Sequence, residues 1–349
     1  MGDILHALPA VTALRQAHPS WQIGWVVDPK WAPLLEAGTE GTREQGIESQ
    51  ETGSPARPLV DRLHLAPAKA WSRQPFARTT RVQIRALRSE LREADYEAVL
   101  DLLGAIRSSL IGWMTASLRR IGAAEPWEWP AKLFYTDLVI TRGAHVAEQN
   151  LELAETVFAD ELEAVAPRLP VDAKAEAWCD GWLERALAGS ASKPIAMIAP
   201  SAGWGAKIWP AERYREVALG LKERGFFVAV NAGPGEEQLA AAITADGAAT
   251  ALDASLAQLI AFTRRIKLAV GGDTGPIHLA AALQRPVVGI YGPTDPSRNG
   301  PFGTRARILR SPGSRRDHKR RAAPDPGLLT IRPDEVLAAA DELLNEGKN

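Results

Sequence analysis

The second half of the chain alternates short apolar runs with segments of helical periodicity, and this alternation restricts the possible folds more than any other feature. The apolar runs occupy residues 195–199, 226–231, 266–270 and 287–291. Strands that are buried on both faces of a parallel sheet have this nearly continuous apolar character. The pattern therefore predicts an α/β fold built on a doubly wound parallel sheet.

The helices expected around these strands combine apolar residues at helical spacing with charged residues on the opposite face. They occupy residues 211–224, 236–245, 256–263, 277–283 and 333–344. The first half has the same character, with strands expected at 21–27 and 98–103 and helices at 82–94 and 149–158. In the helix at 82–94, arginines at helical spacing alternate with glutamates, as on a solvated helix face.

The length of the chain and a proline-rich segment define the expected domains. A chain of 349 residues is too long for one ordinary core and predicts two domains. The segment 166–170 has linker character, and residues 38–58 are expected to form a loop. The expected division is a first Rossmann-like domain at 1–165, a linker and connecting helix at 166–192, a second Rossmann-like domain at 193–330 and a C-terminal helix at 331–349.

Composition excludes several classes of protein. The net charge of −1 creates no global field that would attract nucleic acid. A single cysteine, Cys179, excludes a disulfide framework and a cysteine-rich zinc site, and the six histidines have no metal-ligand spacing. No signal peptide and no apolar run of membrane-spanning length are found. The eleven tryptophans are expected in the core, in domain packing or at a membrane interface.

The segment GGDTGPIH at residues 271–278 joins an apolar strand to a helix. The amino end of a helix presents unpaired N–H groups and a positive dipole end, so it attracts anions. Asp273, Thr274 and His278 add a carboxylate, a hydroxyl and an imidazole, which suit a sugar, and the two glycines leave room for a ligand. The simpler interpretation is a capped helix, with Asp273 and Thr274 at the capping positions and Pro276 in the first turn.

The segment PSAGWGAKIWP at residues 200–210 also follows an apolar strand. Ser201, Ala202 and Gly203 are small enough for the backbone to approach a phosphate, and Lys207 can neutralise its charge. The Walker pattern is absent, so this is not a P-loop. A solvated lysine is the alternative, but the carboxyl end of a parallel strand is where ligands bind.

The segment NAGPGEE at residues 231–237 lies after the next strand. A carboxylate at this position, Glu236 or Glu237, can accept hydrogen bonds from both hydroxyls of a ribose. Acidic residues are equally expected in the first turn of a helix, where they interact favourably with the dipole. The sequence does not distinguish the two interpretations or the two glutamates.

Three further segments carry candidate residues. In MGDILHALP at residues 1–9, Asp3 lies at a helix start and is either an N-cap or a general base. Arg107 follows the strand that contains Asp101, and it either contacts an anionic acceptor or pairs with Asp101 or a helix carboxylate. The basic run at 315–321 is either a solvated loop or a contact with anionic lipid headgroups.

Together these segments resemble glycosyltransferase family nine, the heptosyltransferases of lipopolysaccharide core synthesis. The resemblance covers nearly the whole chain and is carried by MGDILHALPA, DLLGAIRS, KIWP, GGDTGPIHLAAAL and VVGIYGPTDP. Its detail is most similar to the branch that adds the first heptose. It implies the GT-B fold, in which two Rossmann-like domains face a cleft, with the acceptor side in the first domain and the nucleotide side in the second.

The resemblance also implies roles for individual residues. Asp3 is implied as the base and Lys207 as the group that stabilises the departing diphosphate. The implied donor-binding residues are Ser201, Ala202, Gly203, Lys207, Glu236, Glu237, Asp273, Thr274, Gly275 and His278. The implied acceptor-binding residues are Gly2, His6 and Arg107.

The implied reaction moves L-glycero-D-manno-heptose from ADP-heptose, with inversion, to 3-deoxy-manno-octulosonic acid (Kdo) on lipid A. The enzyme is then cytoplasmic and peripheral on the inner face of the inner membrane. It needs no cofactor, with loosely bound Mg²⁺ as an open alternative, and it binds no nucleic acid; no oligomeric state is predicted. The alternatives are a GT-B transferase or epimerase that uses another nucleotide sugar, and a non-catalytic nucleotide-sugar-binding relative. A dinucleotide oxidoreductase is disfavoured, because no G-x-G-x-x-G follows an early strand.

The sequence departs from the family pattern at three places. Leu103 stands where the family often has glutamine, and Ala202-Gly203 stands where some members have hydroxyl residues. In relatives a strand precedes the Met-Gly-Asp turn, whereas this sequence starts at that turn. The expectation from the third departure is that the first strand of the first domain is missing because the start is misplaced or trimmed.

Overall fold

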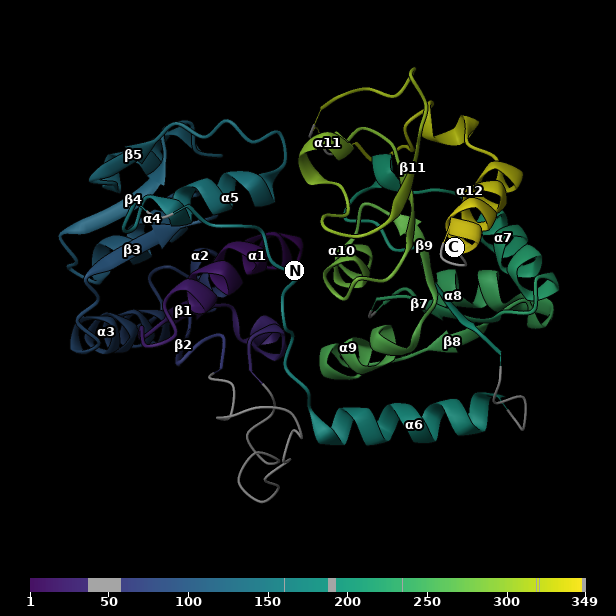
Figure 1. Cartoon of the computed structure of the whole chain (residues 1–349), viewed down its shortest axis with the longest axis horizontal. Helices are drawn as coiled ribbons and strands as arrows, with labels where there is room; N and C mark the ends of the chain where they lie inside the picture. The colour runs from purple at the N-terminus through teal and green to yellow at the C-terminus, as the bar shows by residue number, and fades with distance from the viewer. Residues whose placement is uncertain are drawn as a thin grey trace. The chain divides into compact units, whose positions relative to one another are not determined.

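The computed structural model describes residues 1–36, 58–159, 161–187, 193–233, 235–317, 319 and 321–346. The described residues form two compact units, one from most of residues 3–170 and the other mainly from residues beyond 170 (Figure 1). The loop expected at residues 38–58 lies, apart from its last residue, outside the described residues.

The second unit is built on a six-stranded, fully parallel sheet with the strand order β11-β10-β9-β6-β7-β8. Its strands are β6 (Ile195–Ala199), β7 (Phe227–Asn231), β8 (Thr250–Leu252), β9 (Leu268–Gly272), β10 (Val287–Tyr291) and β11 (Ala306–Arg310). The chain proceeds from β6 in one direction to β8 and then returns to β9, so the order reverses between β6 and β9. This is the doubly wound arrangement that the sequence predicted, with its switch point between β6 and β9.

Helices connect these strands. They are α6 (Ala173–Leu187), α7 (Ala211–Glu223), α8 (Glu237–Thr244), α9 (Leu256–Arg265), α10 (Gly275–Ala282), α11 (Pro296–Asn299) and α12 (Pro333–Glu346). Short 3₁₀ turns are η3 (Gly205–Lys207), η4 (Ala245–Gly247) and η5 (Leu328–Thr330).

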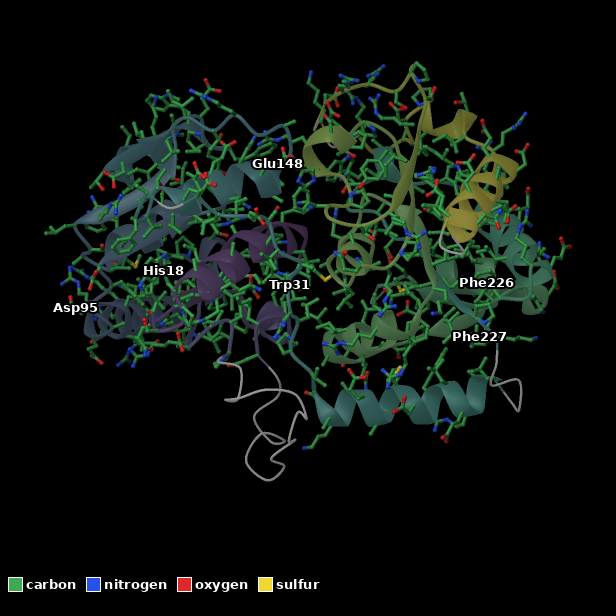
Figure 2. The ribbon with its side chains drawn as sticks, viewed as in Figure 1. His18, Trp31, Asp95, Glu148, Phe226 and Phe227 are labelled. Carbon is green, nitrogen blue, oxygen red and sulfur yellow. The ribbon has the colours of Figure 1, made fainter. Side chains whose placement is uncertain are left out.

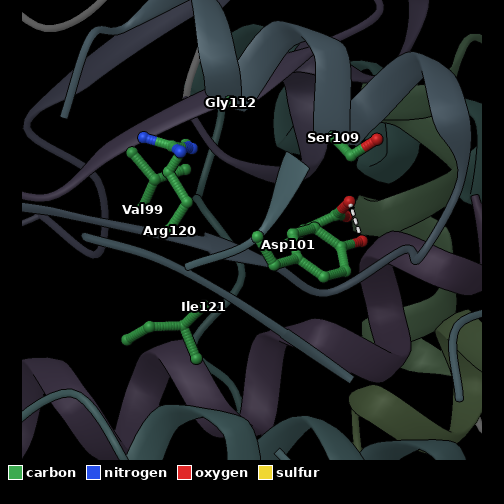
Figure 3. A pocket seen from close by; sticks show the side chains of 7 residues that line it. Val99, Asp101, Ser109, Gly112, Arg120 and Ile121 are labelled. Carbon is green, nitrogen blue, oxygen red and sulfur yellow. Dashed lines mark hydrogen bonds between the residues drawn. The ribbon is translucent and has the colours of Figure 1, made fainter. Parts of the chain in front are cut away.

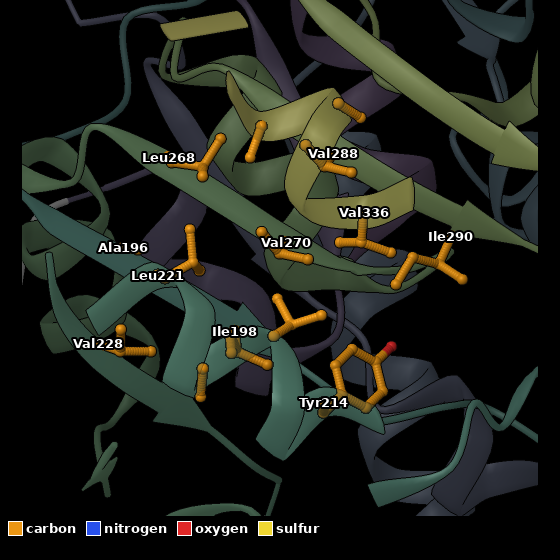
Figure 4. Packing of buried hydrophobic residues seen from close by; sticks show 14 of the residues in the cluster. Ala196, Ile198, Tyr214, Leu221, Val228, Leu268, Val270, Val288, Ile290 and Val336 are labelled. Carbon is orange, nitrogen blue, oxygen red and sulfur yellow. The ribbon is translucent and has the colours of Figure 1, made fainter. Parts of the chain in front are cut away.

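The main core of the second unit lies where α7 and α12 cover the sheet (Figure 4). Val270 and Ile290 of the sheet, Leu221 of α7 and Val336 of α12 are almost completely buried there. Gly220 allows the two helices to approach closely, because a β-carbon at this position would lie 2.4 Å from the Leu337 side chain. Burial of this apolar surface is the main stabilising contribution to the unit.

Helix α6 lies in the segment that the sequence assigned to the connection, and it packs against α9. Glu176 of α6 forms ion pairs with Arg264 and Arg265 of α9. The Trp182 ring meets the Phe262 ring edge to face, with 5.5 Å between the ring centroids. These contacts make α6 part of the second unit.

The first unit contains two parallel sheets in its described residues, one with the pair β1-β2 and one with the order β3-β4-β5. The strands are β1 (Gly24–Val27), β2 (Arg62–Leu65), β3 (Ala98–Asp101), β4 (Arg119–Ala123) and β5 (Asp137–Val139). The helices and 3₁₀ turns are α1 (Gly2–Ala17), η1 (Pro29–Leu34), α2 (Ala68–Arg73), α3 (Arg78–Glu93), α4 (Ile106–Met114), η2 (Trp129–Phe134) and α5 (Val146–Glu155).

Two residues labelled in Figure 2 mark helix ends in the first unit. His18 follows α1, and its ring stacks on the Trp21 ring with 3.6 Å between the centroids. Asp95 follows α3 with a φ of 48°, a left-handed conformation that reverses the chain toward β3. Phe226 and Phe227, also labelled in Figure 2, lie at the start of β7 in the second unit.

The strands that the sequence analysis missed have short or interrupted apolar runs. They are β2, β4, β5, β8 and β11, and all except β4 lie at a sheet edge. Arg62, Arg119, Arg307 and Arg310 interrupt the apolar pattern of three of them. An edge strand has one partner strand and needs no continuous apolar run, so periodicity does not reveal it.

The two glycines of the GGDTG segment belong to β9, whereas the sequence predicted that the strand would end at residue 270. A β-carbon on Gly271 would lie 2.5 Å from the carbonyl oxygen of Ala199 on β6 and 3.0 Å from the Ile277 side chain. The absence of a side chain at Gly271 is therefore required by the packing of β9. The interpretation that this glycine leaves room for a ligand was wrong.

Gly271→Ala is expected to lower the free energy of unfolding by about 2 kcal/mol, because two backbones must move apart. Urea denaturation of the purified variant measures this change. Gly203→Ala is the control, since no atom would lie within 4 Å of a β-carbon at that position. That variant is expected to stay within about 0.5 kcal/mol of the unsubstituted protein. Equal stability of the two variants would contradict the packing role of Gly271.

Candidate functional site

Three loops of the second unit meet at the carboxyl edge of its sheet. The loop with Lys207 follows β6, the loop with Glu236 follows β7, and Asp273 follows β9 directly. All strands of this sheet are parallel, so the three loops emerge on one side. The switch point between β6 and β9 lies among them, which is where open α/β sheets bind ligands.

Asp273 is the centre of this cluster. Its Oδ2 atom accepts a hydrogen bond from the Lys207 ammonium group, and its Oδ1 atom lies 3.0 Å from Nε2 of His278. The Lys207 and Asp273 side chains are each only 10% exposed, so the ion pair is largely shielded from water. The structure thus joins three residues that the sequence predicted from two separate segments.

Burial of Asp273 opposes its ionisation, but neighbouring groups outweigh this effect. The hydrogen bond and charge of His278, together with the Lys207 ammonium group, hold the pKa of the Asp273 carboxyl well below its usual range. The carboxylate is therefore ionised across the physiological pH range and neutralises Lys207 in the absence of an anionic ligand.

The Lys207 loop is held in place from two sides. The lysine Nζ lies 3.9 Å from the centroid of the Trp204 ring, a cation–π contact. The N–H of Ala206 donates to the carbonyl oxygen of Arg321 over 3.0 Å. Gly205 is packed so closely that a β-carbon would lie 1.7 Å from the Ala322 carbonyl oxygen. The ammonium group is therefore preorganised.

Glu236 connects the first two loops. Its Oε2 atom accepts hydrogen bonds from the Ser201 hydroxyl and, over 2.7 Å, from the N–H of Gly233. Glu237 is exposed, and its Oε1 atom accepts a bond of 3.1 Å from the N–H of Gly235 in the same turn. Glu236, and not Glu237, is therefore the residue that bonds to the Ser201 loop.

Helix α10 begins at the same edge, with Thr274 in the capping position and Pro276 in its first turn. The Thr274 side chain makes no capping hydrogen bond, and its Oγ1 atom is buried without a hydrogen-bond partner within the described ranges. The carboxylate of Asp273 is directed to Lys207 and His278 instead. The interpretation of this segment as a helix capped by its own side chains is thus not supported, and a polar group remains for a ligand.

Ala202 and Gly203 lie between the Ser201 and Lys207 side chains in the loop after β6. Gly203 is exposed, and a β-carbon on it would meet no atom within 4 Å. The backbone there has open space above it, as the phosphate-loop prediction requires.

The residues predicted for the acceptor side lie on helices α1 and α4. Gly2 starts α1 and Asp3 is exposed in its first turn, where the helix dipole favours a carboxylate. His6 is buried, and its ring meets the His145 ring edge to face at 5.1 Å. Arg107 is exposed in the first turn of α4.

Asp101 does not pair with Arg107, which corrects one alternative from the sequence. Its Oδ1 atom accepts from the N–H groups of Leu103 and Gly104, each over 3.0 Å. Its Oδ2 atom accepts from the hydroxyls of Ser108 at 2.9 Å and Tyr135 at 2.6 Å. All four bonds stabilise the turn that leads to Arg107.

The bond from Tyr135 to Asp101 lies in a small pocket between α4 and the β3-β4 sheet (Figure 3). Burial, with the Asp101 charge beside it, raises the pKa of the Tyr135 hydroxyl, which therefore stays protonated as a donor. Tyr135 comes from a distant loop and carries no motif, so the sequence contained no signal that would have found it.

Two further observations concern membranes and metals. Over the described ranges, no helix has the length and apolar character needed to cross a bilayer. The same residues contain no cluster of three or more histidine, cysteine, aspartate or glutamate side chains arranged to hold a metal ion.

Comparison with known proteins relates this geometry to a family. The model of glycosyltransferase family 9 (heptosyltransferase) matches residues 84–326. Lipopolysaccharide heptosyltransferase 1 of Escherichia coli O18:K1:H7 is 28% identical over 323 residues, which are 90% of each chain. Its counterpart in Pseudomonas aeruginosa is 29% identical over 318 residues, which are 87% of this chain and 79% of that protein. The E. coli heptosyltransferase WaaC with ADP-2-deoxy-2-fluoro heptose has a TM-score of 0.71 at 24% identity, covering 99% of this chain and 96% of that chain.

The fold is therefore GT-B, with two Rossmann-like units, and the protein is a glycosyltransferase. The chain belongs to glycosyltransferase family 9, the heptosyltransferases, because the family model matches more than half of it.

Asp273→Asn is expected to destabilise the second unit by about 3 kcal/mol at pH 7, because it leaves the buried Lys207 ammonium group without a counter-charge. Urea denaturation measures the change. Asp334→Asn is the control, since it removes one partner of the exposed pair Arg332–Asp334 and should cost at most about 1 kcal/mol.

The difference between the unsubstituted protein and Asp273→Asn should also depend on pH. A carboxyl group with a lowered native pKa stabilises the fold fully above its unfolded pKa, near 4, and loses this effect as the pH falls toward the native value. The difference is therefore expected to be constant from about pH 8 to 5 and to shrink below about pH 4. A difference that shrinks already at neutral pH would contradict the assignment.

Proposed function

We propose that this protein is an inverting glycosyltransferase that moves L-glycero-D-manno-heptose from ADP-heptose to Kdo of the lipopolysaccharide inner core. Family membership supports heptosyl transfer. Two relatives that match most of the chain are both heptosyltransferase 1, which supports addition of the first heptose. The similar fold of a heptosyltransferase bound to an ADP-heptose analogue supports ADP-heptose as the donor.

One observation carries the proposal. Beside the switch point of the second sheet lie the Lys207 ammonium group, the amino end of α10 and the Thr274 hydroxyl, which has no hydrogen-bond partner among the residues that the structure describes. A cation, backbone N–H groups and a hydroxyl donor are what a diphosphate requires. Lys207 is already partly desolvated and fixed, so little reorganisation accompanies the reaction.

The chemistry of the leaving group explains why one base is sufficient. A glycosidase must protonate a poor alkoxide leaving group with a second carboxylic acid. A nucleoside diphosphate leaves as an anion and needs positive potential instead, which Lys207 and the α10 dipole provide. Asp3 of the first unit is the proposed base that removes the proton from the acceptor hydroxyl. In this scheme no metal is required, and loosely bound Mg²⁺ would only add to the positive potential at the diphosphate.

Glu236 is the proposed ribose-binding residue. Its carboxylate already accepts two hydrogen bonds from Ser201 and Gly233, and a ribose diol can take the place of the serine donor. Asp273 and His278 are proposed to hold hydroxyls or phosphate of the donor. The acceptor contacts assigned to Gly2 and Arg107 remain part of the proposal. The buried ring of His6 fits a packing role better.

Glu236→Gln is expected to weaken ADP binding about 10-fold or more, because an amide replaces the ionised acceptor of two hydroxyl bonds. Isothermal titration calorimetry with ADP measures the dissociation constant. Glu237→Gln is the matched control in the neighbouring position and should bind ADP as the unsubstituted protein does. A larger loss in Glu237→Gln would reverse the assignment.

Asp3→Asn is expected to abolish heptose transfer while retaining ADP-heptose binding, because Asp3 acts on the acceptor alone.

Lys207→Ala is expected to lower turnover by about 100-fold or more if Lys207 acts on charge that develops in the transition state. Transfer to a Kdo acceptor is measured by ADP release, and binding by thermal shift with ADP-, UDP- and GDP-sugars.

The same measurements identify the rival functions. A larger thermal shift with a UDP- or GDP-sugar than with ADP-heptose would assign another nucleotide sugar. Binding of ADP-heptose with no turnover on any Kdo acceptor would assign a binding protein. Retained transfer in Asp3→Asn would place the base elsewhere.

A further inference from the structure

Lys207 and Trp204 stand three residues apart in the loop after β6. The N–H of Lys207 donates to the carbonyl oxygen of Trp204 over 3.1 Å, which closes the 3₁₀ turn η3. Side chains three residues apart in such a turn lie nearly one above the other. This spacing places the indole ring beside the ammonium group, with 3.9 Å between the lysine Nζ and the ring centroid.

The backbone of this turn is fixed by a second segment of the same unit. Ala206 donates its N–H to the carbonyl oxygen of Arg321 over 3.0 Å, and its own carbonyl oxygen accepts from the N–H of Asp325 over 3.2 Å. Gly205 packs against the Ala322 carbonyl group so closely that no side chain would fit. The two ends of the turn, which carry the ring and the ammonium group, are therefore held in a fixed relation.

The contact between Lys207 and Trp204 is shielded from water. The Lys207 side chain is only 10% exposed, and its ammonium group also pairs with Asp273. In a second contact of this kind, Lys132 lies over the ring of Trp129 at 4.7 Å, and Trp129 is 61% exposed. A cation–π contact is stronger when it is desolvated, so the shorter and more buried Trp204 contact is the one expected to have a measurable effect.

The Asp273 carboxylate and the Trp204 ring differ in a way that matters for a reaction at phosphate. Asp273 is ionised and neutralises the charge of Lys207. The ring face attracts a cation, but it carries no net charge and does not compete for the N–H groups of the ammonium. A diphosphate can therefore replace Asp273 as the hydrogen-bonded partner of Lys207 while the ring contact stays.

We propose that Trp204 is a positioning residue, whose ring keeps the Lys207 ammonium group in place when the diphosphate of the donor replaces Asp273 as its partner. This inference rests on the proposed function, because that function assigns Lys207 to the diphosphate. A lysine side chain has a flexible four-carbon stem, and without the ring it is free to change rotamer and to become hydrated when it leaves Asp273. The ring also keeps water away from the ammonium group, which strengthens its effect on charge that develops on the leaving oxygen.

Two substitutions in the full chain test this role. Trp204→Leu removes the ring face, whereas Trp204→Phe keeps a smaller one. Trp204→Leu is expected to lower kcat for heptose transfer by about 10-fold and to change KM for ADP-heptose less than kcat. Trp204→Phe is expected to lower kcat by only about 3-fold, because its ring still attracts the cation. ADP release measures both constants.

A double-variant cycle separates positioning from a general structural role. In Lys207→Ala there is no ammonium group to hold, so adding Trp204→Leu should lower kcat by less than about 2-fold. An equal loss in both backgrounds, or no loss in Trp204→Leu alone, would overturn the proposal. Trp129→Leu is the matched control, because it removes the ring beside Lys132, and it should keep the kcat of the unsubstituted protein.

Urea denaturation of each variant checks that the loss of turnover does not arise from unfolding. If Trp204→Leu is unstable, the same cycle is carried out with Trp204→Phe. That variant should lose about 3-fold in kcat with Lys207 present and nothing in Lys207→Ala.

Binding of ADP gives a readout that requires no transfer. ADP carries the charge of the departing group, so isothermal titration calorimetry should show about 10-fold weaker ADP binding in Trp204→Leu. In the Lys207→Ala background the same substitution should weaken ADP binding by less than about 2-fold.

The two sets of measurements distinguish failure of this inference from failure of the proposed function. Coupled losses in ADP binding without any heptose transfer by the unsubstituted protein would refute the proposed function and retain the role of Trp204. Heptose transfer without coupling between Trp204 and Lys207 would refute the role of Trp204 alone. Absence of ADP binding by the unsubstituted protein would refute both.

Discussion

The buried Asp273 carboxylate is the interaction on which the candidate site depends. It accepts hydrogen bonds from Lys207 and His278, and so joins the loop after β6 to the first turns of α10. Its lowered pKa keeps it ionised, so it pairs with the almost buried Lys207 side chain and fixes the position of that side chain. A single ionised group thereby sets the position of the positive charge that the proposed leaving group requires.

This arrangement depends on the backbone of the sheet. Gly271 lets β9 lie against β6, and the order of the sheet reverses between these same two strands. The close approach aligns the ends of β6 and β9, so residues 66 positions apart in sequence form one ion pair. The packing of Gly205 against Ala322 then fixes the lysine loop from the other side. The position of the Lys207–Asp273 ion pair therefore depends on how the backbone packs at this edge of the sheet.

The two units carry different surfaces. In the second unit, charged and polar groups around the sheet edge bind one another, as in the Lys207–Asp273 ion pair and the Ser201–Glu236 hydrogen bond. In the first unit, helix α3 carries exposed arginines at intervals of three and four residues, and helix α4 carries exposed apolar side chains. The first pattern favours a small anionic ligand.

The sequence by itself determined the parallel α/β class, the central strands and the loops that hold Lys207, Glu236 and Asp273, because these features depend on local periodicity and on residues adjacent to strands. Edge strands such as β8 and β11 were missed, since half-buried strands have weak patterns. Only the tertiary structure showed that Glu236, and not Glu237, bonds to Ser201, that Asp101 accepts from Tyr135 and does not pair with Arg107, and that the packing of β9 requires the absence of a side chain at Gly271. All of these are contacts between segments distant in sequence, and packing geometry alone determines which of them form.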